Sequence, residues 1–445
     1  MAQATDLPSS DPTSARGDSA DRSALRRVTH VDVDEFAARI WGEQASLSRR
    51  EMLPGGFADL LDADAVDELV SRRGLRTPFL RVVAAGRALP DARFTRGGGV
   101  GATIGDQVDD AALARLFADG STLVLQGLHR AHEPIMDFVR ALTADLGHPV
   151  QANAYVTPPQ NQGFGAHYDV HDVFVLQVGG EKRWRVHAPV LAHPRRDQPW
   201  TDRRAAVEEA AALEPLLDVV LRPGDALYLP AGFLHSAEAL GETSIHLTLG
   251  VHVWTGAHLL AALVDRLGGV EALRAPLPLG VRVGDPEAIA PAVRAVAAAL
   301  AAAVPGVPVD EVAVVLATQA AAATRPAPVG PLAQTRALEA VDLWTRLRWR
   351  PGLAATLVGP PDGPPGGPPG GPASGPPGGP VGLVVRTPEA TVTLPAGASA
   401  AVRRLLVGEV LAVAEFGAGD DGPMEDADRL ETARTLLRAA LAVPQ

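Results

Sequence analysis

Three residues of this chain have the types and the spacing of a metal-ligand set. His167 and Asp169 stand two positions apart in the stretch 153–184, and side chains two apart on an extended strand point to the same face. His235 follows later, after a Pro-Gly-Asp turn at 223–225 and a short apolar run that reads as a buried strand. Two histidines and one carboxylate on one face of an octahedron are the ligands of non-haem Fe(II) oxygenases. We therefore predict that these three residues bind a metal ion.

Other histidines lie close to the predicted ligands in the sequence. His171 shares the face of the first two ligands if the strand stays regular, so the spacing alone does not exclude it. His187, His246 and His252 are expected in the core or around the site, because histidines on strands are more often satisfied by hydrogen bonds than bound to metal.

Lysine is almost absent from this chain. Only one of its 40 basic residues is a lysine, Lys182, which follows Gly179-Gly180, a pair that we expect to form a turn between two antiparallel strands. A lysine carries a compact charge on a slim stem, which suits a narrow pocket that receives one end of a small dicarboxylate. We predict that Lys182 pairs with the distal carboxylate of 2-oxoglutarate while the keto-acid end of this co-substrate chelates iron.

Four motifs carry a resemblance to a known family: His167-Tyr-Asp169, the strand Phe174-Val-Leu-Gln177, Lys182-Arg-Trp184-Arg-Val, and Pro223-Gly-Asp-Ala-Leu-Tyr-Leu-Pro230 with His235. They resemble the JmjC-type cupin hydroxylases, in particular the ribosomal oxygenase branch, over about 120–253. The resemblance implies a double-stranded β-helix that depends on Fe(II), 2-oxoglutarate and O2. It also implies that the substrate is a protein side chain, ribosomal in the best-known members, that His167 rather than His171 is the first ligand, and that Lys182 anchors the co-substrate.

Polar residues on the strands around the site are candidates for binding. In the family, the strand after the last ligand places polar groups near the co-substrate, which fall here on 244–248. We predict that Thr248 and Asn153 contact the co-substrate and that Tyr155 contacts the substrate. The residues alone leave a structural hydrogen bond equally open for Asn153 and Tyr155. Tyr168 points away from the ligands and is expected to pack.

Composition narrows the function classes. The chain has no cysteine, so disulfides, zinc-thiolate sites and thiol nucleophiles are excluded, and its net charge of −12 disfavours non-specific binding to nucleic acid. No apolar run reaches 18 residues, because Pro291 and Arg294 interrupt the alanine-rich segment 288–304. We therefore expect no transmembrane helix and a cytoplasmic location.

With 445 residues the chain should form two or three domains. We expect a polar, disordered tail at 1–28, then a mainly β catalytic domain with helices at 29–254, in which an α/β collar covers a JmjC or cupin barrel. A polar insertion at 188–216 should lie at the surface of this barrel and help to shape access for substrate. Helices at 255–304 correspond to a dimerisation module in the relatives, so we predict a homodimer.

The remaining residues, 305–445, resemble the winged-helix module that ends several ribosomal oxygenases. A Pro/Gly-rich insertion at 359–380 interrupts them, without the strict glycine period of collagen. From Val381 onward there are six arginines against nine acidic residues, whereas a phosphate-binding face needs the opposite balance. We predict a structural or protein-docking module that does not bind DNA directly.

Other functions remain open on the sequence. The same barrel can hold another divalent metal and act as an isomerase or as a dioxygenase without a keto acid, but Lys182 then has no evident purpose. A catalytically silent cupin that docks proteins, or a hydroxylase of a small molecule or peptide, are further alternatives. The intact ligand set and the two C-terminal modules favour a protein hydroxylase.

Overall fold

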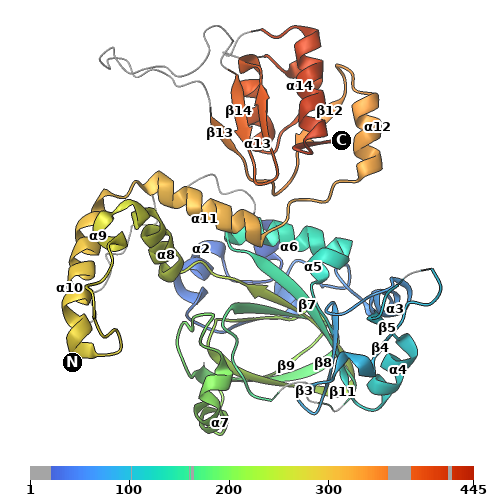
Figure 1. Cartoon of the computed structure of the whole chain (residues 1–445). Coiled ribbons are helices and arrows are strands. Elements are labelled where there is room, and N and C mark those ends of the chain that lie inside the picture. Colours follow the sequence, from blue (N-terminus) through green and yellow to red (C-terminus); the bar gives the residue numbers. More distant parts are fainter. Residues whose placement is uncertain (1–21, 102, 160, 162–164, 359–381, 419–422) are drawn as a thin grey trace. The chain divides into compact units, whose positions relative to one another are not determined.

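The structure is a computed structural model that describes residues 22–101, 103–159, 161, 165–358, 382–418 and 423–445 (Figure 1). The chain divides into two compact units, Met1–Val253 and Trp254–Gln445. This boundary lies next to the predicted end of the catalytic domain at 254. The predicted insertion at 359–380 and most of the predicted tail at 1–28 lie outside the described residues.

The first unit alternates short helices with strands. In chain order its elements are α1 (Ser23–Arg26), α2 (Val33–Glu35), β1 (Ser46–Ser48), α3 (Ala63–Arg72), β2 (Leu80–Ala84), β3 (Arg87–Ala88), β4 (Thr95–Arg96), β5 (Gln107–Val108), α4 (Asp110–Ala118), β6 (Thr122–Leu125), α5 (Leu128–Ala131), α6 (Glu133–Leu146), β7 (Val150–Thr157), β8 (Asp172–Pro189), α7 (Arg204–Ala211), β9 (Leu217–Leu221), β10 (Ala226–Leu229) and β11 (Phe233–Val251). Nine of the strands form one antiparallel sheet in the order β1-β10-β8-β11-β7-β6-β2-β3, with β9 paired to β8.

Two long strands turn this sheet into a barrel. β8 has 18 residues and β11 has 19, and they pair with each other from end to end. The first part of β8, at 173–176, also pairs with β10, whereas its second part, at 182–186, pairs with β9. β8 therefore pairs with different strands along its two halves, and the strands curve around a common centre in Figure 1. The predicted double-stranded β-helix is confirmed.

Alternation along the strands separates two cores. Phe174 and Leu176 of β8 belong to the large core between the sheet and the helices, whereas Val173 and Val175 belong to a smaller core inside the barrel. This is the period of two expected for a strand that is buried on both faces. The barrel thus has an apolar outer face under the collar and an inner face where polar groups and metal ligands can stand.

Local signals in the sequence explain where two helices of the collar begin and end. The carboxylate of Asp62 accepts a hydrogen bond from the backbone N–H of Ala65 at 2.8 Å and caps α3. α6 carries proline in its first turn, ends at Gly147 in the left-handed conformation (φ 70°), and buries Ile135 and Leu142 against the sheet. The predicted α/β collar is therefore present.

The predicted disordered tail is too long at its C-terminal end. Residues 23–26 form α1, where Leu25 is only 2% exposed and its backbone N–H donates to a carboxylate oxygen of Asp145 at 2.9 Å. Ala24 and Val28 are also buried in the large core. Local composition is polar here, but three apolar side chains suffice to hold the segment against α6.

The predicted turn at Gly179-Gly180 is wrong. β8 continues through this pair as one strand, and the irregularity lies opposite, where β11 has a bulge between Leu240 and Ile245. Gly180 has φ +61°, and a Cβ atom there would lie 2.2 Å from the backbone oxygen of Thr243. The two glycines therefore serve a bulged crossing of two long strands rather than a hairpin.

This close approach predicts that Gly180→Ala is more harmful than Gly241→Ala. Both glycines have a left-handed φ (+61° and +67°), which costs an alanine about 1–2 kcal/mol. Only at Gly180 does the new Cβ meet backbone, since nothing lies within 4 Å of the position at Gly241. We expect a clearly larger loss in the urea-unfolding midpoint for Gly180→Ala, and equal losses in the two variants would contradict the bulge.

A second prediction concerns the core under the ligand-bearing strands. Phe174 is fully buried, stacked on Phe36 with ring centroids 6.1 Å apart and packed on Tyr228 at 4.9 Å. Phe174→Ala should therefore lower the free energy of unfolding by about 3–5 kcal/mol. The exposed Leu216, at 61% exposure, is the matched control, and Leu216→Ala should change it by less than about 0.5 kcal/mol. Urea unfolding followed by tryptophan fluorescence measures both, and a loss below 1 kcal/mol at Phe174 would refute the packing argument.

The second unit begins with helices and ends in two small sheets. Its elements are α8 (Gly256–Arg266), α9 (Glu271–Arg274), α10 (Pro286–Ala303), α11 (Val309–Ala323), α12 (Pro331–Glu339), β12 (Arg346–Trp349), β13 (Thr356–Val358), β14 (Leu383–Arg386), β15 (Thr391–Leu394), α13 (Ser399–Leu406), β16 (Val410–Ala412), α14 (Asp426–Arg438) and β17 (Ala442–Pro444). The sheets have the orders β16-β12-β17 and β13-β14-β15. β14 and β15 form an antiparallel hairpin, while the winged-helix assignment stays a prediction.

Candidate metal centre and its cavity

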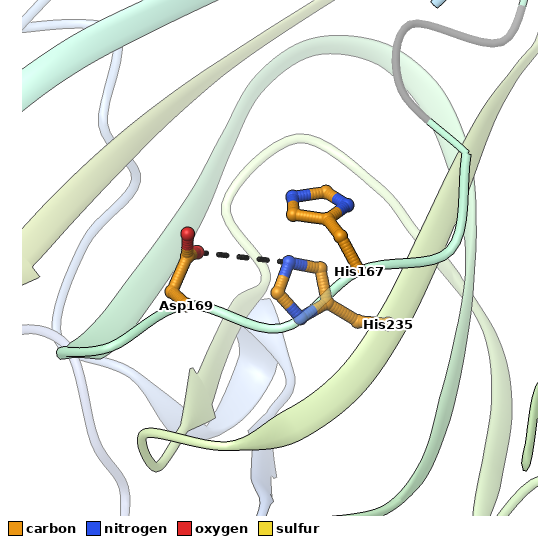
Figure 2. Close-up of side chains that lie close together, drawn as sticks. All are labelled: His167, Asp169 and His235. Carbon is orange, nitrogen blue, oxygen red and sulfur yellow. Dashed lines mark ion pairs between the residues drawn. The ribbon is translucent and has the colours of Figure 1, made fainter. Parts of the chain in front are cut away.

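The three predicted ligands come from two neighbouring segments of the barrel. His167 lies directly opposite His235, since the backbone N–H of each donates to the carbonyl of the other, at 3.1 and 2.8 Å. The carbonyl of Asp169 accepts from the backbone N–H of Gly232 at 2.9 Å. Because these backbone bonds hold the two segments in register, the three side chains emerge on one side and point toward one another (Figure 2).

The ligand atoms are close enough to share one ion. The nearest nitrogen or oxygen atoms of His167, Asp169 and His235 all lie within 4.8 Å of one another. A carboxylate oxygen of Asp169 is 3.7 Å from Nε2 of His235, and the two imidazole rings have centroids 4.5 Å apart. Donors about 2 Å from one ion on one face of an octahedron lie about 3 Å apart, so the three side chains would draw closer together to bind an ion.

Hydrogen bonds at the far side of both rings determine which nitrogen faces the centre. Nδ1 of His167 lies 2.8 Å from the carbonyl oxygen of Gly165, and Nδ1 of His235 lies 3.0 Å from that of Phe233. A carbonyl oxygen only accepts, so both Nδ1 atoms carry the proton and both Nε2 lone pairs remain for a metal. The donor set therefore fits an Fe(II) site of two histidines and one carboxylate.

The electrostatics prepare the same protonation states. Burial would raise the pKa of the Asp169 carboxyl, but the charges of His235, His171 and His167 outweigh it and lower the pKa. Burial and the charge of His167 lower the pKa of His235 to about 4. At neutral pH the site thus presents a carboxylate and a neutral imidazole, the forms that bind metal.

His171 is excluded from the ligand set by its stacking. Its ring lies against that of His252, with centroids 5.3 Å apart and planes at 22°. Its Nε2 also approaches Gly250, where a Cβ atom would be only 2.6 Å away. The strand does not stay regular between Asp169 and the start of β8 at Asp172, so the parity that left His171 open does not hold.

A cavity of about 340 Å³ opens beside the three ligands. Its walls combine aromatic, small apolar and polar residues. Besides the ligands, the described residues that line it are Arg81, Gly86, Tyr155, Gly165, Val173, Val175, Lys182, Trp184, Trp200, Ala237, His246 and Thr248. The predicted contact residues Lys182, Tyr155 and Thr248 are thus brought together with the metal ligands.

Lys182 points into the barrel interior. It is 3% exposed, and its ammonium donates to the hydroxyl of Thr157 at 3.2 Å. Burial lowers the pKa of Lys182 to about 7. No carboxylate of the described residues pairs with it, so an anion from solution can bind here without displacing a protein group.

Two further polar residues face the cavity from neighbouring strands. Tyr155 of β7 stacks on His246 of β11, with ring centroids 4.9 Å apart and planes at 5°. Burial, followed by the charge of Asp169, raises the pKa of Tyr155 to about 12. His246 is 3% exposed, and burial and the charge of Lys182 lower its pKa well below the usual value. Its Nδ1 has no hydrogen-bond partner among the described residues.

Asn153 has a structural contact instead. Its side-chain oxygen accepts a hydrogen bond from the backbone N–H of Gly127 at 3.0 Å, where the chain enters α5 with φ 65°. It pairs with Thr248 in the strand register but is not among the described residues that line the cavity. The sequence left open a contact with the co-substrate or a structural hydrogen bond for Asn153, and the structure shows the structural hydrogen bond.

No site role was predicted for Thr157, which binds Lys182, or for Trp184, Arg81 and Trp200, which line the cavity. Thr157 was accessible to sequence reasoning, because it lies two residues beyond Tyr155 and so shares its face. Trp184 likewise lies two beyond Lys182. Arg81 and Trp200 had no such signal, since one comes from the collar and the other from the insertion.

Comparisons with known proteins show what this chain is similar to. Residues 130–259 match the family model of the JmjC domain. Human ribosomal oxygenase 1 is 33% identical over 228 residues, covering 51% of this chain and 33% of that protein. The Drosophila persimilis bifunctional lysine-specific demethylase and histidyl-hydroxylase NO66 is 42% identical over 247 residues, covering 52% of this chain and 32% of that protein. The matched region thus spans about a third of the length of these relatives.

The fold has a solved counterpart. The structure of YcfD, a ribosomal oxygenase from Escherichia coli in complex with cobalt and succinic acid, aligns with a TM-score of 0.50 and 18% identity, covering 94% of this chain and 99% of that one. It supports the double-stranded β-helix derived above. This chain therefore contains a JmjC domain and is a homologue of the ribosomal oxygenases.

Proposed function

We propose that this protein is an Fe(II)- and 2-oxoglutarate-dependent oxygenase that hydroxylates a side chain of a protein substrate. The observation that carries the proposal is the triad of His167, Asp169 and His235, which opens onto a cavity with a buried lysine that pairs with no carboxylate of the described residues. Histidyl hydroxylation and the oxygenase activity named for the relatives point to the same chemistry. An isomerase or a silent docking cupin would leave Lys182 without a role.

The protein's own groups prepare the metal for reaction. His235 and His167 present fixed Nε2 lone pairs, and Asp169 presents a carboxylate on the same side. These three residues would hold Fe(II), and the cavity beside them would admit the co-substrate and O2. Bound Fe(II) together with 2-oxoglutarate and O2 supplies the oxidising power, whereas the chain supplies geometry and exclusion of water.

The walls of the cavity bind and orient the co-substrate. Lys182 offers its ammonium to a carboxylate, and Thr157 holds the lysine nitrogen in place at 3.2 Å. Tyr155 keeps its phenolic proton at neutral pH, so it donates a hydrogen bond, and Thr248 provides a hydroxyl nearby. Val173, Val175 and Ala237 form an apolar wall that keeps water away from the reacting centre.

We further propose that the substrate is a ribosomal protein and that the enzyme acts in the cytoplasm, where such a substrate is made. The names of the relatives support this substrate class. The acidic net charge of −12 also favours a basic protein partner over nucleic acid.

The test is production of succinate from 2-oxoglutarate by the purified full-length protein with Fe(II) and O2. Turnover without substrate reports the metal and co-substrate chemistry directly. We expect succinate above background, and its loss when a chelator removes the metal. A protein that binds neither Fe(II) nor 2-oxoglutarate would refute the oxygenase proposal and favour the docking cupin.

We also propose a homodimer formed by the helical segment of the second unit. α8 and α10 expose apolar side chains, among them Leu259, Leu260, Val293 and Val296, at 42–56% exposure. By length and composition the helix Pro286–Gly306 would also suffice to cross a membrane, and none of its residues is buried within the chain. Covering such a surface with a second copy removes this apolar area from water.

Sedimentation equilibrium of the full-length protein tests whether a second copy of the chain or a membrane covers this apolar surface. We expect a dimer for the wild type, and a monomer for Leu260→Glu combined with Val293→Glu. Flotation of the wild-type protein with lipid vesicles, together with a monomeric state in solution, would contradict the homodimer and assign the surface to a membrane.

A further inference from the structure

The insertion at 188–216 is built on the reverse side of the strands that carry the metal ligands. Tyr168 stands between His167 and Asp169, and Leu234 immediately precedes His235, so both side chains point away from the metal. Tyr168 is 1% exposed and Leu234 is fully buried, and both pack with Val207 of α7. The same two segments therefore hold the ligands on one face and the insertion on the other.

A hydrogen bond ties the loop of the insertion to this small core. The hydroxyl of Tyr168 donates to the carbonyl oxygen of Gln198 at 3.0 Å. The side-chain oxygen of Gln198 in turn accepts from the backbone N–H of Arg195 at 3.0 Å. The loop thus has a defined conformation two residues before Trp200.

Trp200 reaches around to the cavity. It is one of the residues that line the cavity, and its ring centroid lies 6.3 Å from that of the ligand His167. The guanidinium carbon of Arg204 lies 4.8 Å from the indole centroid, over one face of the ring. The indole, with Arg204 over one face and an anchored loop before it, therefore forms a wall beside the ligand His167.

We propose that the insertion is part of the active site and that Trp200 selects the substrate by packing its indole against the side chain that enters the cavity. Tyr168 is a positioning residue, which acts by holding the loop that carries Trp200. An indole face favours planar or cationic side chains over branched aliphatic ones. This inference rests on the proposed function for the nature of the reaction, whereas the contact between Trp200 and the entering side chain does not depend on that reaction.

The experiment measures binding of peptides to the full-length protein loaded with Zn(II) and 2-oxoglutarate, which cannot turn over. The probes are acetylated seven-residue Gly/Ser peptides with a central Arg, Tyr, Leu or Val. Saturation-transfer NMR measures the affinity of each peptide. We expect the Arg and Tyr peptides to bind wild type at least about fivefold tighter than the Leu and Val peptides. Trp200→Leu should remove this preference, and Trp200→Phe should keep most of it.

Trp344, which is 79% exposed in the second unit, supplies the matched control, and Trp344→Leu should leave the preference unchanged. A Trp200→Leu variant that keeps the wild-type preference, or a wild type without any preference, would overturn the proposal. Succinate production is measured separately. A protein that makes no succinate but shows this preference would refute the proposed function and leave the role of Trp200 standing.

Tyr168→Phe tests positioning, since it removes only the hydroxyl. Bound Co(II) quenches the fluorescence of a nearby indole. The contribution of Trp200 is the quenching measured with Trp200 present minus the quenching measured in the Trp200→Leu protein. We expect Tyr168→Phe to reduce this contribution and the peptide preference together, with the thermal midpoint nearly unchanged. If the contribution and the preference both equal those of the wild type, Tyr168 does not position Trp200.

Discussion

Alanine in place of His235 is expected to weaken Co(II) binding by more than about 100-fold and to abolish succinate production. Removing a residue that only orients a ligand typically costs about 10- to 100-fold in metal affinity, so losing a ligand costs more. His235 is 6% exposed and its Nε2 is 3.7 Å from the Asp169 carboxylate. The variant leaves two ligands, which cannot complete one face of an octahedron.

His171→Ala is the matched control for this prediction. His171 is a histidine two residues from Asp169, but it stacks on His252 rather than facing the triad. Co(II) titration should therefore give an affinity within about threefold of wild type, because no coordinating atom is lost. Similar losses in His235→Ala and His171→Ala would mean that the ligand set is misassigned. Circular dichroism checks that both variants fold.

Lys182→Met should remove 2-oxoglutarate binding almost completely, with a loss of at least about 100-fold in affinity. A paired, buried charge–carboxylate contact that loses one partner typically costs 3–5 kcal/mol, because the other charge stays buried without compensation. Methionine keeps the length and the apolar stem. Isothermal titration of the Zn(II)-loaded protein measures the loss. Retention of wild-type affinity would show that the carboxylate binds elsewhere.

The same lysine predicts a pH dependence with a definite sign. Its pKa of about 7 in the protein means that the ammonium is present below pH 7 and is lost as pH rises. Binding of the co-substrate carboxylate should therefore weaken by up to about tenfold for each pH unit above 7. Lys182→Arg is the control, because arginine stays charged throughout this range. If the affinity of the metal-loaded wild type is flat between pH 7 and 9, the ammonium does not bind the carboxylate.

Stability should respond in the opposite sense. An unfolded chain takes up the lysine proton below about pH 10.4, whereas the folded protein takes it up only below about 7. The lowered pKa therefore reduces the free energy of unfolding progressively as pH falls from about 10 to 7, and the reduction stays constant below 7. Lys182→Met is accordingly expected to unfold at a higher urea concentration than wild type at pH 7. The lysine is retained at a cost in stability, as expected for a residue with a binding role.

Spacing and residue type alone gave access to most of the site. Strand parity left His167 and His171 both open beside Asp169, and the resemblance to the JmjC-type hydroxylases favoured His167, whereas His235 follows from the turn and short strand before it. Lys182 stood out because it is the only lysine. The collar helices and the short strand β10 also follow from local pattern, since caps and apolar periodicity act within a few residues.

Other features were decided by contacts between segments far apart in the chain. His171 and His167 are each two residues from Asp169 in the sequence, and in the structure His171 stacks on His252 instead of facing the ligands. Gly179-Gly180 reads as a turn locally, but β11 runs alongside and makes it part of one long strand. Asn153 and Tyr155 share a face, yet Gly127 engages Asn153 and leaves Tyr155 to the cavity.

Local features and long-range features of this site have different physical causes. Which atoms can bind a metal, and which face of a strand they occupy, depend on side-chain chemistry and on a backbone period of two. Which groups meet across the barrel depends on register, bulges and loop anchors, which are set by packing over the whole domain. The sequence by itself therefore determined the ligands and the buried lysine, whereas only the tertiary structure decided that Trp200 and Arg81 complete the cavity.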